Sequence, residues 1–171
     1  MELAGKTMGI IGLGRIGMAT AKLAEAFGME VIACTRTEKE GIRCVSLDTL
    51  LEKADVISLH CPLLPETTQL ICRETIEKMK DGAILLNTSR GGLVNEKDLA
   101  EALKAGKLRG AAVDVVSQEP MEHGNPMLTA PHCIITPHMA WAPVESRQRL
   151  MDCVEGNLRA FLDGHVENCV N

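Results

Sequence analysis

Residues 7–36 read TMGIIGLGRIGMATAKLAEAFGMEVIACTR, and this stretch decides the fold. The apolar run Met8–Ile11 is typical of a buried parallel strand, and Val31–Cys34 is a second run of the same kind. Between them, residues 15–27 have the periodicity of a helix. One face of that helix carries Ile16, Ala19, Leu23 and Phe27. The stretch therefore predicts a β-α-β unit of the usual length, about 30 residues.

The turn between the first strand and the helix carries the pattern Gly-x-Gly-x-x-Gly, which in this context indicates dinucleotide binding. Its first glycine permits a tight turn, its second lets the backbone approach a pyrophosphate, and its third lets the helix pack on the strand. The helix N-terminus attracts an anion, and an arginine in its first turn adds positive charge. A glycine-rich turn that binds no nucleotide is the alternative. We expect cofactor contacts at Gly12, Gly14, Arg15, Ile16 and Gly17.

The end of the second strand indicates which cofactor is bound. NAD-binding proteins of this kind place an Asp or Glu there to accept hydrogen bonds from the ribose 2′-OH. Here the residues are Thr35, Arg36 and Thr37, and the carboxylate of Glu38 comes later. An arginine and two hydroxyl groups suit a 2′-phosphate, so NADP(H) is favoured over NAD(H). Alternatively, Arg36 stacks on the adenine and either cofactor binds.

Length and composition limit the partners and the compartment. With 171 residues, the chain can form one dinucleotide-binding domain over residues 1–171, and we expect the substrate domain of a full enzyme to lie outside this stretch. The net charge is −5 with interspersed signs, so nucleic acid is not an expected partner. No apolar run reaches membrane-spanning length and no signal peptide is visible, so we expect no membrane contact. The seven scattered cysteines contain no Cys-x-x-Cys, which favours reduced thiols in a cytoplasmic protein and no metal site.

Strand and helix patterns alternate along the rest of the chain, which predicts a Rossmann-type α/β fold: a doubly wound, mainly parallel sheet with helices on both faces. Further strands are expected at residues 42–45, 55–60, 83–87, 110–114 and 133–136. Helices are expected at 47–53, with Ser46 as N-cap, at 74–79, at 95–105, with Asn95 as N-cap and Gly106 at its end, and at 144–163. The inner face of the last helix is expected to carry Leu150, Val154, Leu158 and Phe161.

Three polar residues, Arg90, Glu119 and His138, each follow a different predicted strand. In open α/β sheets, such positions converge on a crevice at the carboxyl ends of the strands. Taken singly, Arg90 and Glu119 could be solvated surface charges, and His138 could be a structural histidine. Their joint placement beside a dinucleotide motif favours an active site.

The whole stretch resembles the D-isomer-specific 2-hydroxyacid dehydrogenases. The motifs that carry the resemblance are Gly12-Leu-Gly-Arg-Ile-Gly17, His60-Cys-Pro-Leu-Leu-Pro-Glu-Thr67, Asn87-Thr-Ser-Arg-Gly-Gly92, Ala112-Val-Asp114 with Glu119-Pro120, and Thr136-Pro-His138. The resemblance implies that Arg90, Glu119 and His138 are catalytic. Glu119 also argues against the formate dehydrogenase branch.

These roles are chemically sensible for a 2-oxo acid, which carries a carboxylate beside a ketone. Arg90 can hold the carboxylate and polarise the ketone oxygen. His138 can donate a proton to that oxygen, or accept one in the reverse direction, while Glu119 orients the imidazole and raises its pKa. Asp114 is expected near the nicotinamide carboxamide, with a strand-end cap as the alternative. The resemblance also places cofactor contacts at Cys61, Pro62, Thr67, Thr88, Ser89, Arg90, Asp114 and His138.

Residues 136–150 are most similar to the glycerate dehydrogenase/hydroxypyruvate reductase branch. Trp141 could wall a small polar substrate together with Arg90 and His138, or it could pack at a subunit or domain contact. Hydroxypyruvate or glyoxylate is the expected substrate, with another short 2-oxo acid as the alternative. The resemblance also implies a homodimer. The competing interpretations are an NAD(P)-binding module without turnover, such as a sensor, or a dimerisation module.

Overall fold

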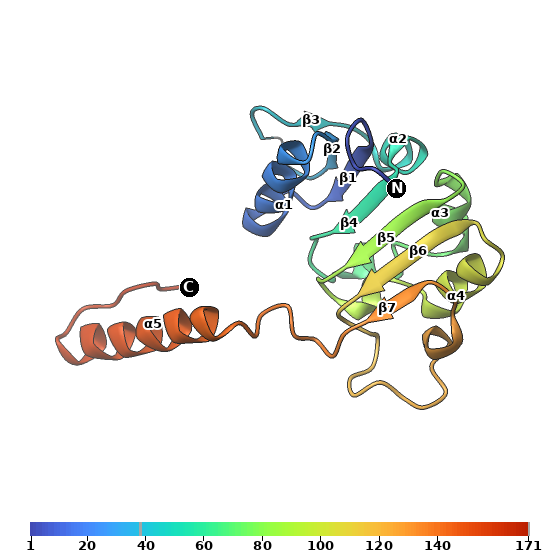
Figure 1. Cartoon of the computed structure of the whole chain (residues 1–171). Helices are drawn as coiled ribbons and strands as arrows, with labels where there is room; N and C mark the ends of the chain where they lie inside the picture. Colours follow the sequence, from blue (N-terminus) through green and yellow to red (C-terminus); the bar gives the residue numbers. More distant parts are fainter. Residues whose placement is uncertain (38, 171) are drawn as a thin grey trace. The chain divides into compact units, whose positions relative to one another are not determined.

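A single sheet of seven strands organises the fold, in the order β3-β2-β1-β4-β5-β6-β7 (Figure 1). The computed structural model describes residues 1–37 and 39–170, and in this part of the chain every strand pair is parallel. This order confirms the predicted doubly wound Rossmann-type sheet. The strands are β1 Thr7–Ile11, β2 Glu30–Cys34, β3 Arg43–Cys44, β4 Val56–Leu59, β5 Ala83–Asn87, β6 Leu108–Val113 and β7 Cys133–Ile135.

The chain divides into two compact units, Met1–Pro137 and His138–Asn171, and each is described by itself. The first unit holds the sheet and its helices. These are α1 Arg15–Ala26, α2 Leu47–Lys53, α3 Arg73–Lys78 and α4 Glu96–Lys104, with short 3₁₀ helices η1 Pro65–Thr67, η2 Gly91–Leu93 and η3 Pro126–Thr129. No helix in the described residues is both long enough and apolar enough to cross a membrane.

Side chains at the helix ends fix where two of these helices begin. Ser46 accepts a hydrogen bond from the Thr49 N–H at 3.2 Å, and Asn95 accepts one from the Asp98 N–H at 3.1 Å. Each bond satisfies a backbone donor that has no partner within the helix. Gly106 follows α4 with a φ of +73°, a conformation that glycine adopts without steric cost. The two predicted N-caps and the predicted end of α4 are confirmed.

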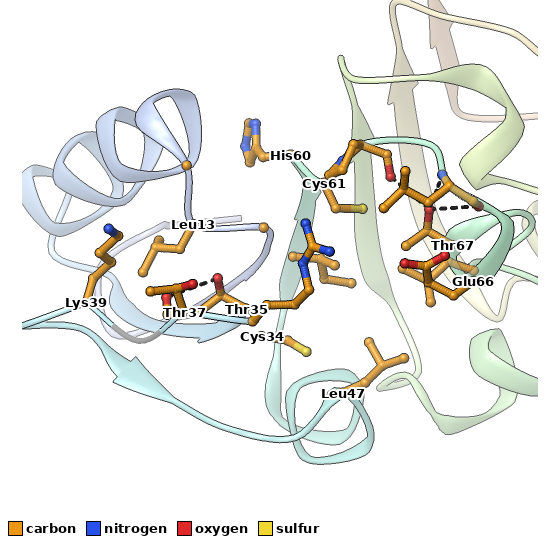
Figure 2. A pocket seen from close by; sticks show the side chains of 17 residues that line it. Leu13, Cys34, Thr35, Thr37, Lys39, Leu47, His60, Cys61, Glu66 and Thr67 are labelled. Carbon is orange, nitrogen blue, oxygen red and sulfur yellow. Dashed lines mark hydrogen bonds between the residues drawn. The ribbon is translucent and has the colours of Figure 1, made fainter. Parts of the chain in front are cut away.

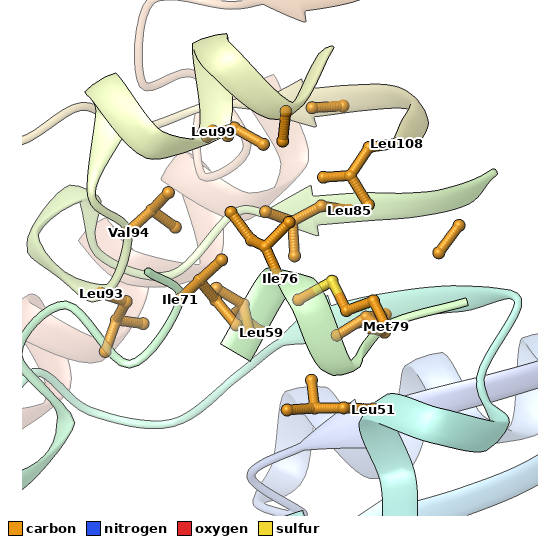
Figure 3. Packing of buried hydrophobic residues seen from close by; sticks show 14 of the residues in the cluster. Leu51, Leu59, Ile71, Ile76, Met79, Leu85, Leu93, Val94, Leu99 and Leu108 are labelled. Carbon is orange, nitrogen blue, oxygen red and sulfur yellow. The ribbon is translucent and has the colours of Figure 1, made fainter. Parts of the chain in front are cut away.

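Helices cover both faces of the sheet, and each face has its own core. The larger cluster packs α2, α3 and α4 on one face, through side chains such as Leu51, Ile76 and Leu99 against Leu59 and Leu85 (Figure 3). The smaller cluster packs α1 on the other face, where its members include Met8, Ile10, Ala21, Ala24 and Ala33. Alternate residues of β1 serve opposite faces, because side chains of a strand alternate in direction.

Helix α1 packs on the sheet by its small residues. Gly17, Ala21 and Ala24 are buried, whereas the stripe of larger residues noted in the sequence lies in solvent. The reason is steric, because a Cβ on Gly17 would lie 2.2 Å from the Gly12 carbonyl oxygen. Only small residues allow the helix this close to the sheet. The exposed stripe consists of Ile16 (70% exposed), Ala19, Leu23 (63%) and Phe27 (63%), and it is called the α1 stripe below.

The second unit consists mainly of α5, Val144–Leu162. The prediction of a buried inner face on this helix is wrong, because the four residues expected there are 52–68% exposed. They are Leu150, Val154, Leu158 and Phe161. The described residues of this unit contain no other helix or strand against which that face could pack. The apolar spacing was sufficient to predict the helix but does not specify what covers it.

Candidate cofactor and active site

A cavity of about 560 Å³ opens at the carboxyl ends of β1, β2 and β4 (Figure 2). This volume is within the usual range for small-molecule and cofactor sites. Carboxyl ends of parallel strands are where open α/β sheets bind ligands. Eight of the residues predicted to contact a cofactor line the cavity: Gly12, Gly14, Thr35, Arg36, Thr37, Cys61, Pro62 and Thr67.

The three motif glycines have three different surroundings. Gly12 has a φ of +97°, and a Cβ there would lie 2.5 Å from the Cys61 backbone nitrogen. Gly17 has no room for a Cβ against Gly12. Gly14, which lines the cavity, has no heavy atom within 4 Å of its Cβ position. Gly12 and Gly17 are therefore required by packing, while Gly14 leaves space where a ligand can approach the backbone.

The N-terminus of α1 is built to receive an anion. Gly14 is its N-cap and supplies no side-chain cap, so backbone N–H groups of the first turn remain available. The first turn contains no acidic residue, and it contains Arg15. Arg15 and Ile16 are both exposed and are not among the cavity-lining residues. Their predicted contacts with a cofactor stay predictions.

One side of the cavity is formed by the residues after β2. Figure 2 shows Thr35, Thr37 and Lys39 grouped there, and the Thr35 hydroxyl donates to the Thr37 carbonyl at 3.3 Å. Arg36 also lines this side. Two cations and two threonines thus face the cavity, while Glu38 lies outside the described residues. Lys39 was missed from the sequence, although its position three residues after Arg36 was a signal.

The opposite side is formed by the loop after β4, which includes Cys61, Pro62, Glu66 and Thr67 (Figure 2). The Thr67 hydroxyl accepts from the Leu64 N–H at 2.8 Å and lies 2.8 Å from the Pro62 carbonyl oxygen, to which it donates. Thr67 therefore braces this loop internally. Further lining residues that the sequence analysis did not single out are Ile11, Leu13, Cys34, Leu47, His60, Leu64, Glu66 and Leu70.

His60 and two cysteines add neutral groups to the wall of this cavity. The His60 Nε2 lies 2.9 Å from the Ser58 hydroxyl, and burial lowers the pKa of the imidazole. Burial likewise raises the pKa of the Cys34 and Cys61 thiols, with a smaller contribution from the neighbouring cysteine in each case. All three groups are therefore in their uncharged forms at neutral pH.

The turn after β5 carries three predicted site residues. The buried Asn87 side chain holds this turn by donating to the Arg90 carbonyl at 3.0 Å and accepting from the Ser89 N–H at 3.1 Å. The Ser89 hydroxyl donates to the Cys61 carbonyl at 2.8 Å, which joins the turn to the cavity loop. Thr88 is exposed, and the exposed Arg90 guanidinium donates to the Ser89 carbonyl at 2.7 Å. None of the three lines the cavity described above.

The loop after β6 carries Glu119 and lies directly against this turn. A Cβ on Gly91 would lie 1.9 Å from the Val116 carbonyl carbon, so the two backbones touch. Glu119 is exposed and accepts from the Val116 N–H at 3.2 Å. Asp114 is buried at the start of the loop, where its carboxylate accepts from the Thr136 hydroxyl. The segments that carry Arg90 and Glu119 are thus neighbours, while the catalytic roles of these two residues stay predictions.

His138 is the first residue of the second unit, so its convergence with Arg90 and Glu119 stays a prediction. Its φ is +51°, a region that non-glycine residues rarely occupy and that is often found at functional sites. The Trp141 indole N–H donates to the His138 carbonyl at 2.7 Å, and its side chain is 59% exposed. Trp141 therefore braces the turn that presents His138.

Among the described residues, no group of three or more His, Cys, Asp or Glu side chains is placed to hold a metal ion. The glycine cradle, the anion-receptive helix end and the adjoining cavity instead fit a dinucleotide. Fold and site together define a dinucleotide-binding domain with polar residues at the ends of its central strands.

The chain belongs to the D-isomer specific 2-hydroxyacid dehydrogenases: residues 1–140 match the family model for their NAD binding domain. It is 55% identical to a hydroxypyruvate reductase of Blautia hydrogenotrophica over 100% of the chain and 55% of that protein. It is 48% identical to a glycerate dehydrogenase of Methylorubrum extorquens over 99% of the chain and 54% of that protein. Both relatives confirm the resemblance drawn from the motifs.

Among solved structures, the TT0316 protein of Thermus thermophilus superimposes with a TM-score of 0.93 at 47% identity, covering 98% of this chain and 54% of that one. The chain thus spans about half the length of the proteins it matches.

Proposed function

We propose that the protein containing this chain is an NAD(P)-dependent oxidoreductase that interconverts a small 2-oxo acid and its D-2-hydroxy acid. Hydroxypyruvate/glycerate is the first choice of substrate pair and glyoxylate/glycolate the second. The observation that carries the proposal is the juxtaposition of a glycine-cradled nucleotide cavity with the segments that present Arg90 and Glu119. The names of the relatives support the substrate class.

The proposed chemistry divides between the cofactor and the chain. The bound nicotinamide supplies or accepts the hydride. The Arg90 guanidinium is an exposed planar fork that can hold the substrate carboxylate and polarise the ketone. His138 gives a proton to the ketone oxygen, or removes it in the reverse direction, and Glu119 orients the imidazole. The buried Asp114, fixed by Thr136, can accept a hydrogen bond from the carboxamide.

The site further supports NADP(H) over NAD(H). Arg36 and Lys39 supply two positive charges beside the hydroxyls of Thr35 and Thr37, and these groups match the charge and hydrogen-bonding needs of a 2′-phosphate. Glu66, which lines the cavity on its opposite side, is the one carboxylate among the lining residues given by the described part of the chain.

The proposal includes a homodimer and a cytoplasmic location. The exposed α1 stripe and the exposed apolar face of α5 support self-association, because large apolar patches mark interaction surfaces. Free thiols at Cys34, Cys61 and Cys133 support a reducing compartment.

Calorimetric titration of the chain with NADPH and NADH, followed by turnover assays of the full-length protein with hydroxypyruvate and glyoxylate, tests the proposal. We expect NADPH to bind more tightly and hydroxypyruvate to be reduced. His138→Ala is expected to abolish turnover and leave cofactor affinity nearly unchanged. Full turnover by that variant would refute the acid/base role, and binding of neither cofactor would favour a dimerisation module.

A further inference from the structure

The loop that carries Glu119 is held by one side chain from a different element. Glu96, the first residue of α4, accepts hydrogen bonds from the Ser117 N–H at 2.6 Å, from the Ser117 hydroxyl at 3.0 Å and from the Asn125 amide at 2.8 Å. Ser117 and Asn125 flank Glu119 on its two sides in the sequence. A single carboxylate thus ties down both ends of the segment that presents Glu119.

The exposed part of this segment is held by hydrogen bonds, while Met121 further along packs against the larger core. Ser117 and Glu119 are exposed, so burial of apolar surface does not immobilise them. Hydrogen bonds to a charged acceptor are stronger than bonds between neutral groups. A carboxylate is also the one side chain of this shape that can accept from three donors at once, because both of its terminal atoms are acceptors. In a glutamine, one of these atoms is an NH₂ nitrogen, which donates and cannot accept from an N–H or O–H group.

Glu96 also lies close in sequence to the Arg90 turn. The η2 helix and Asn95 connect Arg90 to α4, and Gly91 is packed against the Val116–Ser117 backbone. The same two segments therefore meet twice, once by the Gly91 contact and once through the Glu96 hydrogen bonds. Together the two contacts fix the Glu119 loop against the segment that carries Arg90.

We propose that Glu96 is a positioning residue for the active site, which sets the Glu119 loop relative to the Arg90 turn. This inference rests on the proposed function. Glu96 is not among the residues that line the cofactor cavity. Its loss should therefore change the chemical step and leave cofactor binding nearly unaffected.

The test compares Glu96→Gln with Glu101→Gln in the full-length protein. Glu101 is a matched control, since it is also a carboxylate on α4 but bonds Arg73 of α3 at 2.6 Å, away from the loop. We expect Glu96→Gln to lower kcat roughly 10- to 100-fold, the scale of a misplacement of about 1 Å, with the KM for NAD(P)H within about twofold of wild type. Hydrogen exchange at the Ser117 amide should accelerate in Glu96→Gln alone.

Ser117→Ala provides a milder variant that keeps the backbone bond and removes the hydroxyl bond, so folding is not at risk. It should lower kcat less than Glu96→Gln, and the double variant should be no slower than Glu96→Gln alone. Equal kcat in Glu96→Gln, Glu101→Gln and wild type would overturn the inference. If the wild type reduces no 2-oxo acid, the proposed function fails, and the exchange rates of Ser117 still decide whether Glu96 holds the loop.

Discussion

At the scale of single residues, the end of β2 is where cofactor choice is tested. Arg36 lines the cavity beside Thr35, Thr37 and Lys39. Arg36→Ala should weaken NADPH binding by about 1.5–3 kcal/mol, roughly 10- to 100-fold, because a hydrogen bond between two charged groups is lost. NADH, which lacks the 2′-phosphate, should lose much less. Calorimetric titration of both cofactors measures the difference.

Arg43 provides the control for this prediction. It is an exposed arginine on β3 and is not among the residues that line the cavity. Arg43→Ala removes the same charge from the molecule and should leave both affinities unchanged. Equal losses of NADPH and NADH affinity in Arg36→Ala would show that Arg36 stacks on the adenine, as the alternative interpretation holds.

Asp55 makes a second prediction at this scale, on stability against pH. Burial alone would raise the pKa of its carboxyl, but the Thr7 N–H at 2.8 Å and the Lys80 ammonium at 3.2 Å outweigh burial and lower the pKa. A lowered folded-state pKa stabilises the fold above the unfolded-state pKa of about 3.9, and this stabilisation is lost as the pH falls through the folded-state value.

Asp55→Asn should therefore lower the free energy of unfolding by about 1 kcal/mol at pH 7. The gap between variant and wild type should narrow below about pH 4, where wild-type Asp55 takes up its proton. Urea denaturation at several pH values measures this. Asp81→Asn is the control, since Asp81 is 90% exposed beside Lys107 and its ion pair is solvent-screened. A gap independent of pH would show that Asp55 acts without its charge.

At the scale of elements, two glycines of the strand–turn–helix unit have different roles, one in stability and one in cofactor binding. A Cβ at Gly17 meets the Gly12 backbone, which cannot yield without moving α1, whereas a Cβ at Gly14 meets nothing. Gly17→Ala should therefore cost several kcal/mol of stability, as overpacking against backbone does. Gly14→Ala should change stability by less than about 1 kcal/mol, since its φ of −77° suits alanine.

Gly14→Ala, which should hardly change stability, should strongly affect cofactor binding. Its Cβ would enter the space in which a pyrophosphate approaches the backbone. Gly14→Ala should therefore lower the affinities for NADPH and NADH alike by tenfold or more, which corresponds to a loss of about 1.4 kcal/mol or more of binding free energy. Thermal unfolding of the two variants measures their stability, and titration of each with NADPH and with NADH measures their affinities. A Gly14→Ala variant that binds with wild-type affinity would remove the cofactor from this turn.

Local signals in the sequence were sufficient to predict the elements, and long-range contacts limited the rest. The N-caps Ser46 and Asn95 bond to residues three positions away, so their patterns could be recognised directly. The buried face of α1 could not, because small and large apolar residues form two stripes and only contact with β1 selects between them. Glu96 was missed for the same reason, since its partner Ser117 is 21 residues away.

The site divides in the same way. The glycine motif and the residues after β2 are local patterns, and Gly12, Gly14 and Thr35 to Thr37 line the cavity. His60 and Glu66 also line it, but their participation depends on which loops meet above the sheet. Thr67 illustrates the converse, because its hydroxyl braces its own loop, a role that the sequence motif does not distinguish from ligand contact.

At the scale of the whole molecule, the α1 stripe makes a prediction about assembly. Leu23 is 63% exposed although it lies on a helix whose other face is packed. In a dimer with twofold symmetry each substitution acts twice, once on each copy. Fully burying one leucine contributes about 1.5–3 kcal/mol, so Leu23→Glu should weaken the dimer by about a hundredfold or more if the stripe is the interface. Glutamate keeps helix propensity, which leaves the monomer fold intact.

Sedimentation over a range of concentrations measures the dimer dissociation constant of the full-length protein. Leu128→Glu is the matched control, since Leu128 is also a leucine, 52% exposed, on η3 rather than α1. It should leave the dissociation constant unchanged. A wild-type monomer would refute the homodimer itself, whereas an intact dimer in Leu23→Glu would move the interface away from the stripe. Because a dimer stabilises its folded subunits by mass action, the melting temperature of the wild type should also rise with concentration, and that of Leu23→Glu should not.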